Sequence, residues 1–180
     1  LVAELNRRAQ TERLDGQTAG VEIDLADGNR ASAGDVIITR ANNRKLRTSA
    51  TDWVKNGDRW TVLGIDSKRG IHARHLGSRR HITLPTDYVA ESVELGYAST
   101  THTAQGITAD TMHGLLIGSE SRQQAYTMLT RGRIANHSYL VTVGDGDPHS
   151  AIDPEVINPL TPTDLLERIL GRDEALLSAT

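Results

Sequence analysis

Two short polar stretches carry the side chains best suited to chemistry. The first reads TTHTAQG over residues 100–106, and the second reads TRGR over residues 130–133. Each is expected at the end of an element in one α/β layer, so both would meet at one edge of a sheet. There, Arg131 could stabilise charge that develops on a phosphoryl group during its transfer. Taken alone, Arg131 and Gly132 would be explained as an ordinary helix C-terminus.

The elements before these stretches are mostly β. Spacing of Leu1, Leu5 and Ala9 predicts a helix over residues 1–14, and a strand follows over 21–30 with a turn at Asp27-Gly28. Residues 41–52 are polar and indicate a loop. The remaining strands are expected over residues 34–40, 56–66, 70–76 and 79–85. Several short strands with tight turns predict a small barrel, whose core is expected to contain Trp53 and Trp60.

The second half of the chain has an α/β pattern. A strand over residues 94–102 is expected to lead into TTHTAQG, and 141–160 is expected to be a linker. The other elements are a buried parallel strand over 113–118, a helix over 121–133, a buried strand over 137–144 and a final helix that starts at the capping residues Thr161, Pro162 and Asp164.

The amino-acid composition excludes several kinds of site and of protein. The chain has 180 residues, no Cys and a net charge of −3, so disulfides, Cys-bound zinc and thiol catalysis are excluded. No apolar run approaches the ~20 residues of a membrane helix. Since the chain does not begin with Met, we expect it to be part of a longer protein. Residues 67–86 contain basic side chains and no acidic one, which suits either a polyanion site or a solvated basic hairpin; charge alone favours the hairpin.

Other kinds of site are disfavoured. His72, His75 and His81 have arginines and no carboxylate around them, so no metal site is expected. His102, Asp110 and Ser99 could form a hydrolase triad, but no G-x-S-x-G elbow accompanies them. The sequence also lacks G-x-x-x-x-G-K-[ST], the loop that cradles phosphates. Any nucleotide must therefore be held mainly by another domain.

The two polar stretches resemble motifs of superfamily 1 DNA helicases of the RecD-like branch. TTHTAQGITAD (100–110) is similar to motif V, and AYTMLTRGR (125–133) is similar to motif VI. The stretch GDVIITRANNRKLRTSATDWVKNGDRWTVLGI (34–65) resembles the segment that inserts an SH3-like barrel into the second motor domain. These stretches are most similar in sequence to the helicase region of actinobacterial conjugative relaxase–helicases of the TraA/TraI type. The resemblance extends from about Leu1 to Val143.

The resemblance implies a fold and a set of domains. The fold is α/β, a partial RecA-like (P-loop NTPase-type) motor domain with an inserted small SH3-like β-barrel. Residues 1–33 and 94–145 would form the second motor domain, 34–93 the barrel, and 146–180 a linker and C-terminal helix.

The resemblance also implies roles for individual residues. Arg131 corresponds to the motif VI arginine that reaches the γ-phosphate of ATP bound on the other motor domain. Gln105 and Gly106 form the turn beside the nucleotide, and Thr108 replaces the Glu that approaches the ribose. Arg133 is a second phosphate-binding or structural arginine. The residues expected at single-stranded DNA are Thr101, His102 and Thr103 in motif V, and Lys55, Arg59, Lys68, Arg69, Arg74, Arg79 and Arg80 in the barrel.

The resulting hypothesis is the C-terminal half of an ATP-dependent DNA helicase that acts in conjugative transfer in the cytoplasm. Its partners would be single-stranded DNA, the N-terminal motor half and a relaxase domain of the same chain, with no membrane. ATP and Mg²⁺ would bind in the full-length protein, and this fragment alone would bind neither and be inactive. The alternatives are a non-hydrolysing half that serves as a DNA-binding or scaffold module, and a protein-interaction barrel without DNA affinity.

Overall fold

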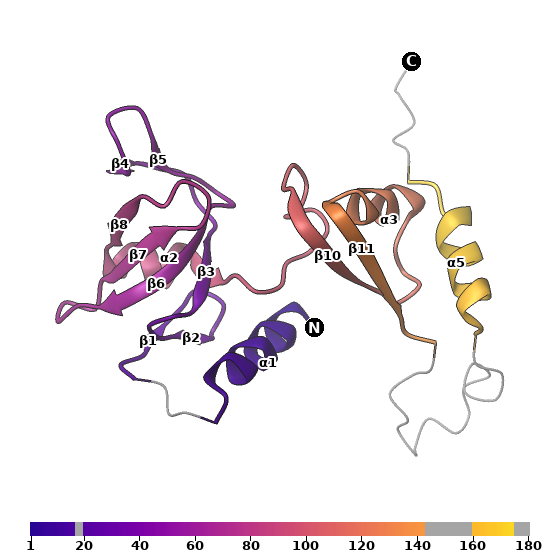
Figure 1. Cartoon of the computed structure of the whole chain (residues 1–180), viewed down its shortest axis with the longest axis horizontal. Helices are drawn as coiled ribbons and strands as arrows, with labels where there is room; N and C mark the ends of the chain where they lie inside the picture. The colour runs from indigo at the N-terminus through magenta and orange to yellow at the C-terminus, as the bar shows by residue number, and fades with distance from the viewer. Residues whose placement is uncertain (17–19, 143–159, 175–180) are drawn as a thin grey trace. The chain divides into compact units, whose positions relative to one another are not determined.

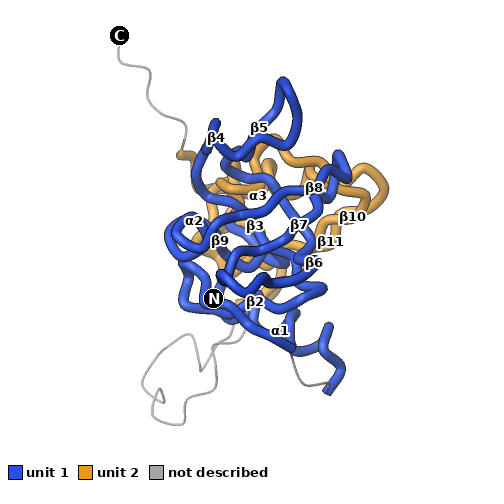
Figure 2. The backbone as a smooth tube through the Cα atoms, turned by 90° about the vertical axis from the view of Figure 1, so that its left-hand side faces the viewer, with its two compact units in different colours: residues 1–100 blue, residues 101–180 orange. Residues whose placement is uncertain are grey.

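The computed structural model describes residues 1–16, 20–142 and 160–174. The chain divides into two compact units, Leu1–Thr100 and Thr101–Thr180, which Figure 2 colours separately.

The first unit contains a five-stranded antiparallel sheet in the order β8-β7-β6-β3-β9. Hairpins β1–β2 and β4–β5 form separate two-stranded sheets, and β4–β5 extends beyond the five-stranded sheet (Figure 1). The elements are α1 (Val2–Leu14), β1 (Ile23–Asp24), β2 (Arg30–Ala31), β3 (Val36–Thr39), β4 (Asn43–Arg47), β5 (Trp53–Val54), β6 (Arg59–Ile65), β7 (Ile71–His75), β8 (His81–Leu84), α2 (Thr86–Ser92) and β9 (Val93–Leu95).

Side-chain alternation along β6 builds the core of this unit. Trp60 and Val62 point inward and are almost fully buried, together with Ile37 on β3 and Ala73 on β7. The Trp60 ring meets His75 edge-on, with 4.8 Å between centroids. Because successive side chains of a strand face opposite sides, Arg59 lies on the outer face of the same sheet.

A buried carboxylate joins the elements around this core. Asp35 is fully buried, and Arg13 on α1 pairs with it at 2.8 Å. Gln10, the Ser32 backbone N–H and the Tyr97 hydroxyl donate to its two oxygens at 2.7, 2.7 and 2.6 Å. A buried charge is tolerated when it is paired and hydrogen-bonded in this way.

Helix α1 is held mainly by polar contacts. Its one buried residue is Asn6, whose amide donates to the Ala98 carbonyl at 3.2 Å and accepts from the Ala98 N–H at 2.7 Å. Asn6, Gln10 and Arg13 are spaced at helical intervals and share one face. The helix over residues 1–14 is confirmed, although two of the apolar residues whose spacing predicted it, Leu1 and Leu5, are exposed.

The second unit pairs β10 (Ala109–Leu116) with β11 (Gly132–Leu140) in parallel, connected through α3 (Arg122–Leu129). Helix α5 (Pro162–Gly171) packs with α3 and these strands (Figure 1) through a small core of Leu116, Ala125, Leu165 and Ile169. Gly114 leaves room for the Met128 side chain on this face, because a Cβ there would collide with it.

Several predicted elements are confirmed. The three barrel strands over 56–66, 70–76 and 79–85 correspond to β6, β7 and β8, and 113–118 belongs to a parallel strand. The final helix begins as expected, with a reciprocal capping box between Thr161 and Asp164 and Pro162 in the first turn. Mixed α/β structure is therefore confirmed.

Other predictions were wrong. The expected loop 41–52 contains β4, whose register opposite β5 includes Arg47 with Trp53. The strand expected over 94–102 ends at Leu95, and the helix expected over 121–133 ends at Leu129. Strands β10 and β11 are largely exposed on one face, where His113 stacks on His137 and Tyr139. On the opposite face of the strand pair, Leu116 and Leu140 pack against α3 and α5.

The assignment of residues 1–33 and 94–145 to a motor domain, 34–93 to the barrel and 146–180 to a tail stays a prediction. In the structure, Ile23, Leu25 and Ala31 pack in the same core as Trp60, so residues before 34 contribute to the barrel core. The expected linker 141–160 lies mostly outside the described residues. Among the described residues, no helix is both long and apolar enough to cross a membrane.

We predict that Asp35→Ala lowers the free energy of unfolding by about 3 kcal/mol or more, since it leaves Arg13 and Tyr97 without their shared acceptor. Urea unfolding followed by tryptophan fluorescence would measure this. Asp24→Ala is the matched control, because the Asp24–Arg30 pair is exposed and should matter little. Equal losses in both variants would contradict the role given to Asp35.

Tyr97 should make stability depend on alkaline pH. Burial, and then the hydrogen bond to Asp35, raise the pKa of Tyr97 from 10.0 to about 12. Between these values the unfolded chain loses the phenolic proton first, so the free energy of unfolding falls as the pH rises. In Tyr97→Phe this component is absent, and its stability curve should be flatter from pH 10 to pH 12. Parallel curves for the two proteins would contradict the prediction.

Candidate functional site

The two polar stretches lie together at the amino ends of β10 and β11. Ala109 and Gly132 are register partners, and the Ala109 N–H donates to the Arg131 carbonyl at 3.0 Å. The expectation that TTHTAQG ends a strand of this layer was wrong, because residues 101–106 form turns before β10. The stretches nevertheless meet at one end of the strand pair, the amino end.

Tight turns give the first stretch its shape. The Gln105 N–H donates to the His102 carbonyl at 3.3 Å, and Ile107 N–H donates to the Ala104 carbonyl at 3.1 Å. Gly106 has a φ of 82°, a conformation that favours glycine over any residue with a side chain. Gln105 and Thr108 are exposed beside it, and Thr101 and Thr103 are half-buried. The loop thus presents polar groups to solvent on a defined backbone.

Arg131 binds neutral acceptors at the end of α3. Its Nε donates to the Thr127 carbonyl at 2.7 Å, its Nη2 to the Thr130 hydroxyl at 2.9 Å, and its Nη1 to the Ile107 carbonyl at 3.4 Å. The last bond connects the two stretches through a side chain. Within the part of the chain that the structure describes, Arg131 has no carboxylate partner. Its positive charge is therefore available to an anion.

Arg133 differs from Arg131 in its partner. It forms an exposed ion pair and hydrogen bonds with Asp110. Gly132, between the two arginines, is held by Asn136, whose amide oxygen accepts from the Gly132 N–H at 2.8 Å. Among the described residues, Arg133 is therefore paired with a carboxylate, whereas Arg131 is bound only by neutral acceptors.

The basic residues of the barrel also divide by partner. Lys55 and Arg80 both pair with Asp52, at 2.5 and 3.3 Å, and Arg69 donates to the Glu22 carbonyl. Lys68 and Arg79 lie exposed in turns, and Arg74 is half-buried on β7. Arg59 stands apart, because its Nε is buried with no hydrogen-bond partner among the residues described. The structure does not bring these side chains into one cluster around a shared partner.

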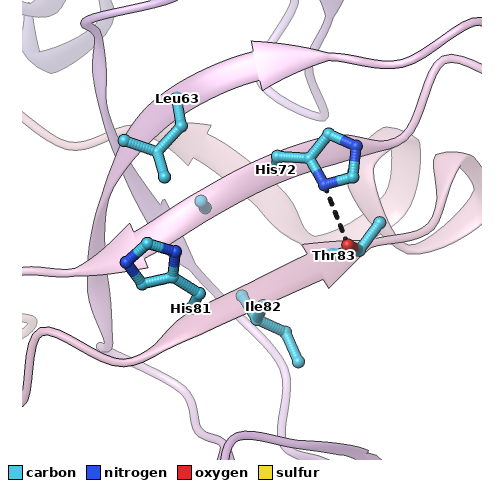
Figure 3. A pocket seen from close by; sticks show the side chains of 6 residues that line it. Leu63, His72, His81, Ile82 and Thr83 are labelled. Atoms are coloured by element: carbon cyan, nitrogen blue, oxygen red, sulfur yellow. Dashed lines mark hydrogen bonds between the residues drawn. The ribbon is translucent and has the colours of Figure 1, made fainter.

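A shallow hollow lies over β6, β7 and β8. Leu63, His72, Ala73, His81, Ile82 and Thr83 line it. His72 and Thr83 face each other across the two strands, with 3.0 Å between Nδ1 and Oγ1 (Figure 3). In the described ranges no group of three metal-binding side chains gathers, here or elsewhere.

Comparisons with known proteins identify the barrel. A family model described as "Rv2311 SH3-like barrel domain" matches residues 23–94. Two proteins of Mycobacterium tuberculosis, Uncharacterized protein Rv2311 of strain H37Rv and Uncharacterized protein MT2373 of strain CDC 1551, are each 37% identical over 132 residues. The alignment covers 71% of this chain and 72% of each relative. The chain belongs to the Rv2311 family. Its SH3-like barrel is thereby confirmed.

Solved structures similar to this Rv2311-family chain include Pif1 helicases. The crystal structure of Bacteroides Pif1 bound to single-stranded DNA matches with a TM-score of 0.51 and 18% identity. Pif1 from Candida albicans matches with a TM-score of 0.47 and 12% identity. The chain spans 38% of the length of the Bacteroides protein and 73% of its own residues are matched. The Bacteroides match shows a helicase-like fold.

Sequence reasoning missed part of the basic surface of this Rv2311-family barrel. Trp53 was expected in the core but is only half-buried, with Arg44 5.1 Å and Lys55 5.6 Å from its ring centroid. Exposed cations follow along β4 at Arg44, Lys45 and Arg47. Treating 41–52 as a loop concealed them, although Arg44 lies over the ring of Trp53 on the opposite strand.

Proposed function

We propose that this chain is the second half of a superfamily 1 DNA helicase motor, which couples ATP hydrolysis to movement on single-stranded DNA. Arg131 would complete an ATP site whose phosphate-binding loop and Mg²⁺ belong to the other motor half. Gln105, Gly106, Thr108 and Arg133 would line the same site. Thr101, His102 and Thr103 would link this site to the DNA backbone.

One observation carries this proposal. The Arg131 guanidinium contacts the Ile107 carbonyl, and the Arg131 carbonyl accepts from Ala109. A movement of Arg131 toward an ATP phosphate would therefore also displace the loop that contains Gly106. The helicase-like fold shared with Bacteroides Pif1, a protein solved with single-stranded DNA, supports the same function.

The wider context is part of the proposal. The parent would be a conjugative relaxase–helicase of the RecD-like branch, acting in the cytoplasm, with a relaxase domain in the same chain. The resemblance of residues 100–110 and 125–133 to motifs V and VI is the support for this context.

We predict that Arg131→Ala in the complete motor lowers the rate of ATP hydrolysis about a thousandfold or more, the scale of an arginine finger. Single-stranded DNA affinity should stay nearly unchanged. Arg122→Ala is the matched control, because Arg122 lies in the same unit, is given no role in the site and already pairs with Asp173. Steady-state hydrolysis and fluorescence anisotropy would measure both variants. If the two variants lose hydrolysis equally, Arg131 has no special role.

A second function is favoured by the length of the relatives. The 132 aligned residues make up 72% of each mycobacterial relative, so those proteins are about as long as this chain. A chain of that length cannot hold two motor domains, each of which needs a core of its own. The second candidate is therefore a non-hydrolysing motor half that binds single-stranded DNA or serves as a scaffold.

We predict that the purified chain binds oligothymidine with an affinity that falls as salt rises, because Lys and Arg contacts release counterions from the strand. It should hydrolyse no ATP by itself, since it lacks the phosphate-cradling loop. Titrations at two salt concentrations and a phosphate-release assay test these points. DNA-stimulated hydrolysis that a mutation within the chain abolishes would contradict the second part. A protein-interaction barrel would show no salt-dependent affinity.

A further inference from the structure

A row of aromatic side chains lies on the exposed face of the β10–β11 pair. His113 on β10 and His137 on β11 are register partners, so both side chains leave their strands on the same face. Their imidazole rings are stacked, with 4.8 Å between centroids and 19° between planes. The ring of Tyr139 stacks on His113 with 5.9 Å between centroids. All three side chains are exposed, whereas Leu116 on the other face packs against α3 and α5.

The Tyr139 hydroxyl is in a position to orient the His113 ring, because its oxygen lies 2.9 Å from His113 Nδ1. When Nδ1 carries the imidazole proton and donates it to this oxygen, Nε2 keeps a free lone pair. Histidines that bind metals use this arrangement, in which one nitrogen ligates and the other donates to a neighbouring oxygen. Tyr139 therefore corresponds to the orienting partner of a metal-binding histidine.

The separation of the two imidazoles suits a shared cation. Nitrogens that ligate one cation lie ~2.0–2.1 Å from it, so two of them are at most about 4.2 Å apart. The rings of His113 and His137 are 4.8 Å apart between centroids. The Cβ–Cγ torsion of histidine is broad, and a rotation of these exposed rings can bring one nitrogen of each to that separation. The strands themselves need not move.

The charges around this pair do not oppose a cation. Besides the histidines, β10 and β11 contain one basic residue, Arg133, and it is paired with Asp110. The histidines of the barrel differ in this respect. His72 and His81 line the hollow in Figure 3, but Arg74 is the register partner of His81, and its charge repels a cation. Of the exposed histidine pairs, the one on β10–β11 is therefore better suited to a metal.

Stacking alone gives the pair a modest structural value. Aromatic side chains opposite each other on neighbouring strands stabilise a sheet slightly, and a phenyl ring would serve as well. Two imidazoles add two nitrogen ligands of the kind that copper, nickel and zinc accept. In the described ranges no third His, Cys, Asp or Glu joins them, so the other coordination positions would be left to water.

We propose that His113 and His137 form a two-imidazole site for a divalent transition-metal cation of the copper, nickel and zinc class, with Tyr139 as the positioning residue of His113. The site does not depend on the proposed function and uses none of its residues. Because it has two protein ligands, it should be weaker than a closed zinc site with four. Copper should bind more tightly than nickel or zinc, and magnesium, which prefers oxygen ligands, should not compete.

The test compares His137→Phe with His72→Phe in the untagged 180-residue chain. Phenylalanine keeps a flat ring that can stack on His113 and removes the nitrogens. In calorimetric titrations with Cu²⁺, the affinity of His137→Phe should be about tenfold or more below that of the wild type, because the second ligand no longer adds its effective concentration. The matched control, His72→Phe, changes an exposed histidine of the other unit and should bind as the wild type does.

A second variant, Tyr139→Phe, separates orientation from ligation. It keeps both imidazoles and loses the hydroxyl, so the Cu²⁺ affinity should fall about tenfold, as for other orienting partners. Electron paramagnetic resonance of the copper complex should show two coordinated ring nitrogens in the wild type and in Tyr139→Phe, and one in His137→Phe. Thermal unfolding in the presence of EDTA should show that all the variants are folded.

Three results would overturn the metal site. The first is equal Cu²⁺ affinity in the wild type and in folded His137→Phe. The second is an equal loss of affinity in His137→Phe and His72→Phe, which would indicate scattered coordination by surface histidines. The third is a wild-type chain that binds none of Cu²⁺, Ni²⁺ and Zn²⁺. Unchanged affinity in Tyr139→Phe, with a loss in His137→Phe, would overturn the role of Tyr139 alone.

Discussion

A single buried carboxylate constrains the barrel unit. Asp35 accepts from α1 through Gln10 and Arg13, from the backbone of Ser32 and from Tyr97 beyond β9. Displacement of any of these elements would leave a charged group in the interior without its donors, which is more costly than the loss of an ordinary contact. The constraint matters most for α1, which buries Asn6 and no apolar side chain fully. Its position therefore depends on hydrogen bonds and not on an apolar stripe.

This constraint also fixes where the first candidate loop begins. Tyr97 is held by Asp35, and both backbone groups of Ala98 are held by Asn6, directly before residues 100–106. In the second unit the same loop ends at Ala109, which is tied to Arg131. Within the second unit, the Gly106 turn and the bond from Ala109 to Arg131 give this segment a defined backbone.

Sequence patterns predicted what depends on local spacing. Alternation of Trp60 and Val62 located the core side of β6, and Thr161-Pro162 located the start of α5, because caps and strand periodicity are local properties. They failed where the partner is distant in sequence. The spacing of Leu1 and Leu5 predicted the helix α1, but it did not reveal that Asp35 and Ala98 hold the face with Asn6. Trp53 was taken for a core residue because nothing local reveals that β4 places Arg44 beside it.

At the candidate site, sequence patterns also fail to predict which charges are paired, because the partners are distant in sequence. A count of basic residues directed attention to 67–86, where no acid occurs in the sequence. In the folded chain the balance is set by residues from elsewhere: Asp52 neutralises Arg80, and Asp110 neutralises Arg133. The arginines without a carboxylate partner among the described residues include Arg59, outside that stretch, and Arg131. Because a polyanion responds to the net field of a face, the pairing of each arginine determines which faces of a protein attract one. Those pairings join residues that are distant in sequence and meet only in the folded chain, so a list of charges along the chain does not contain them.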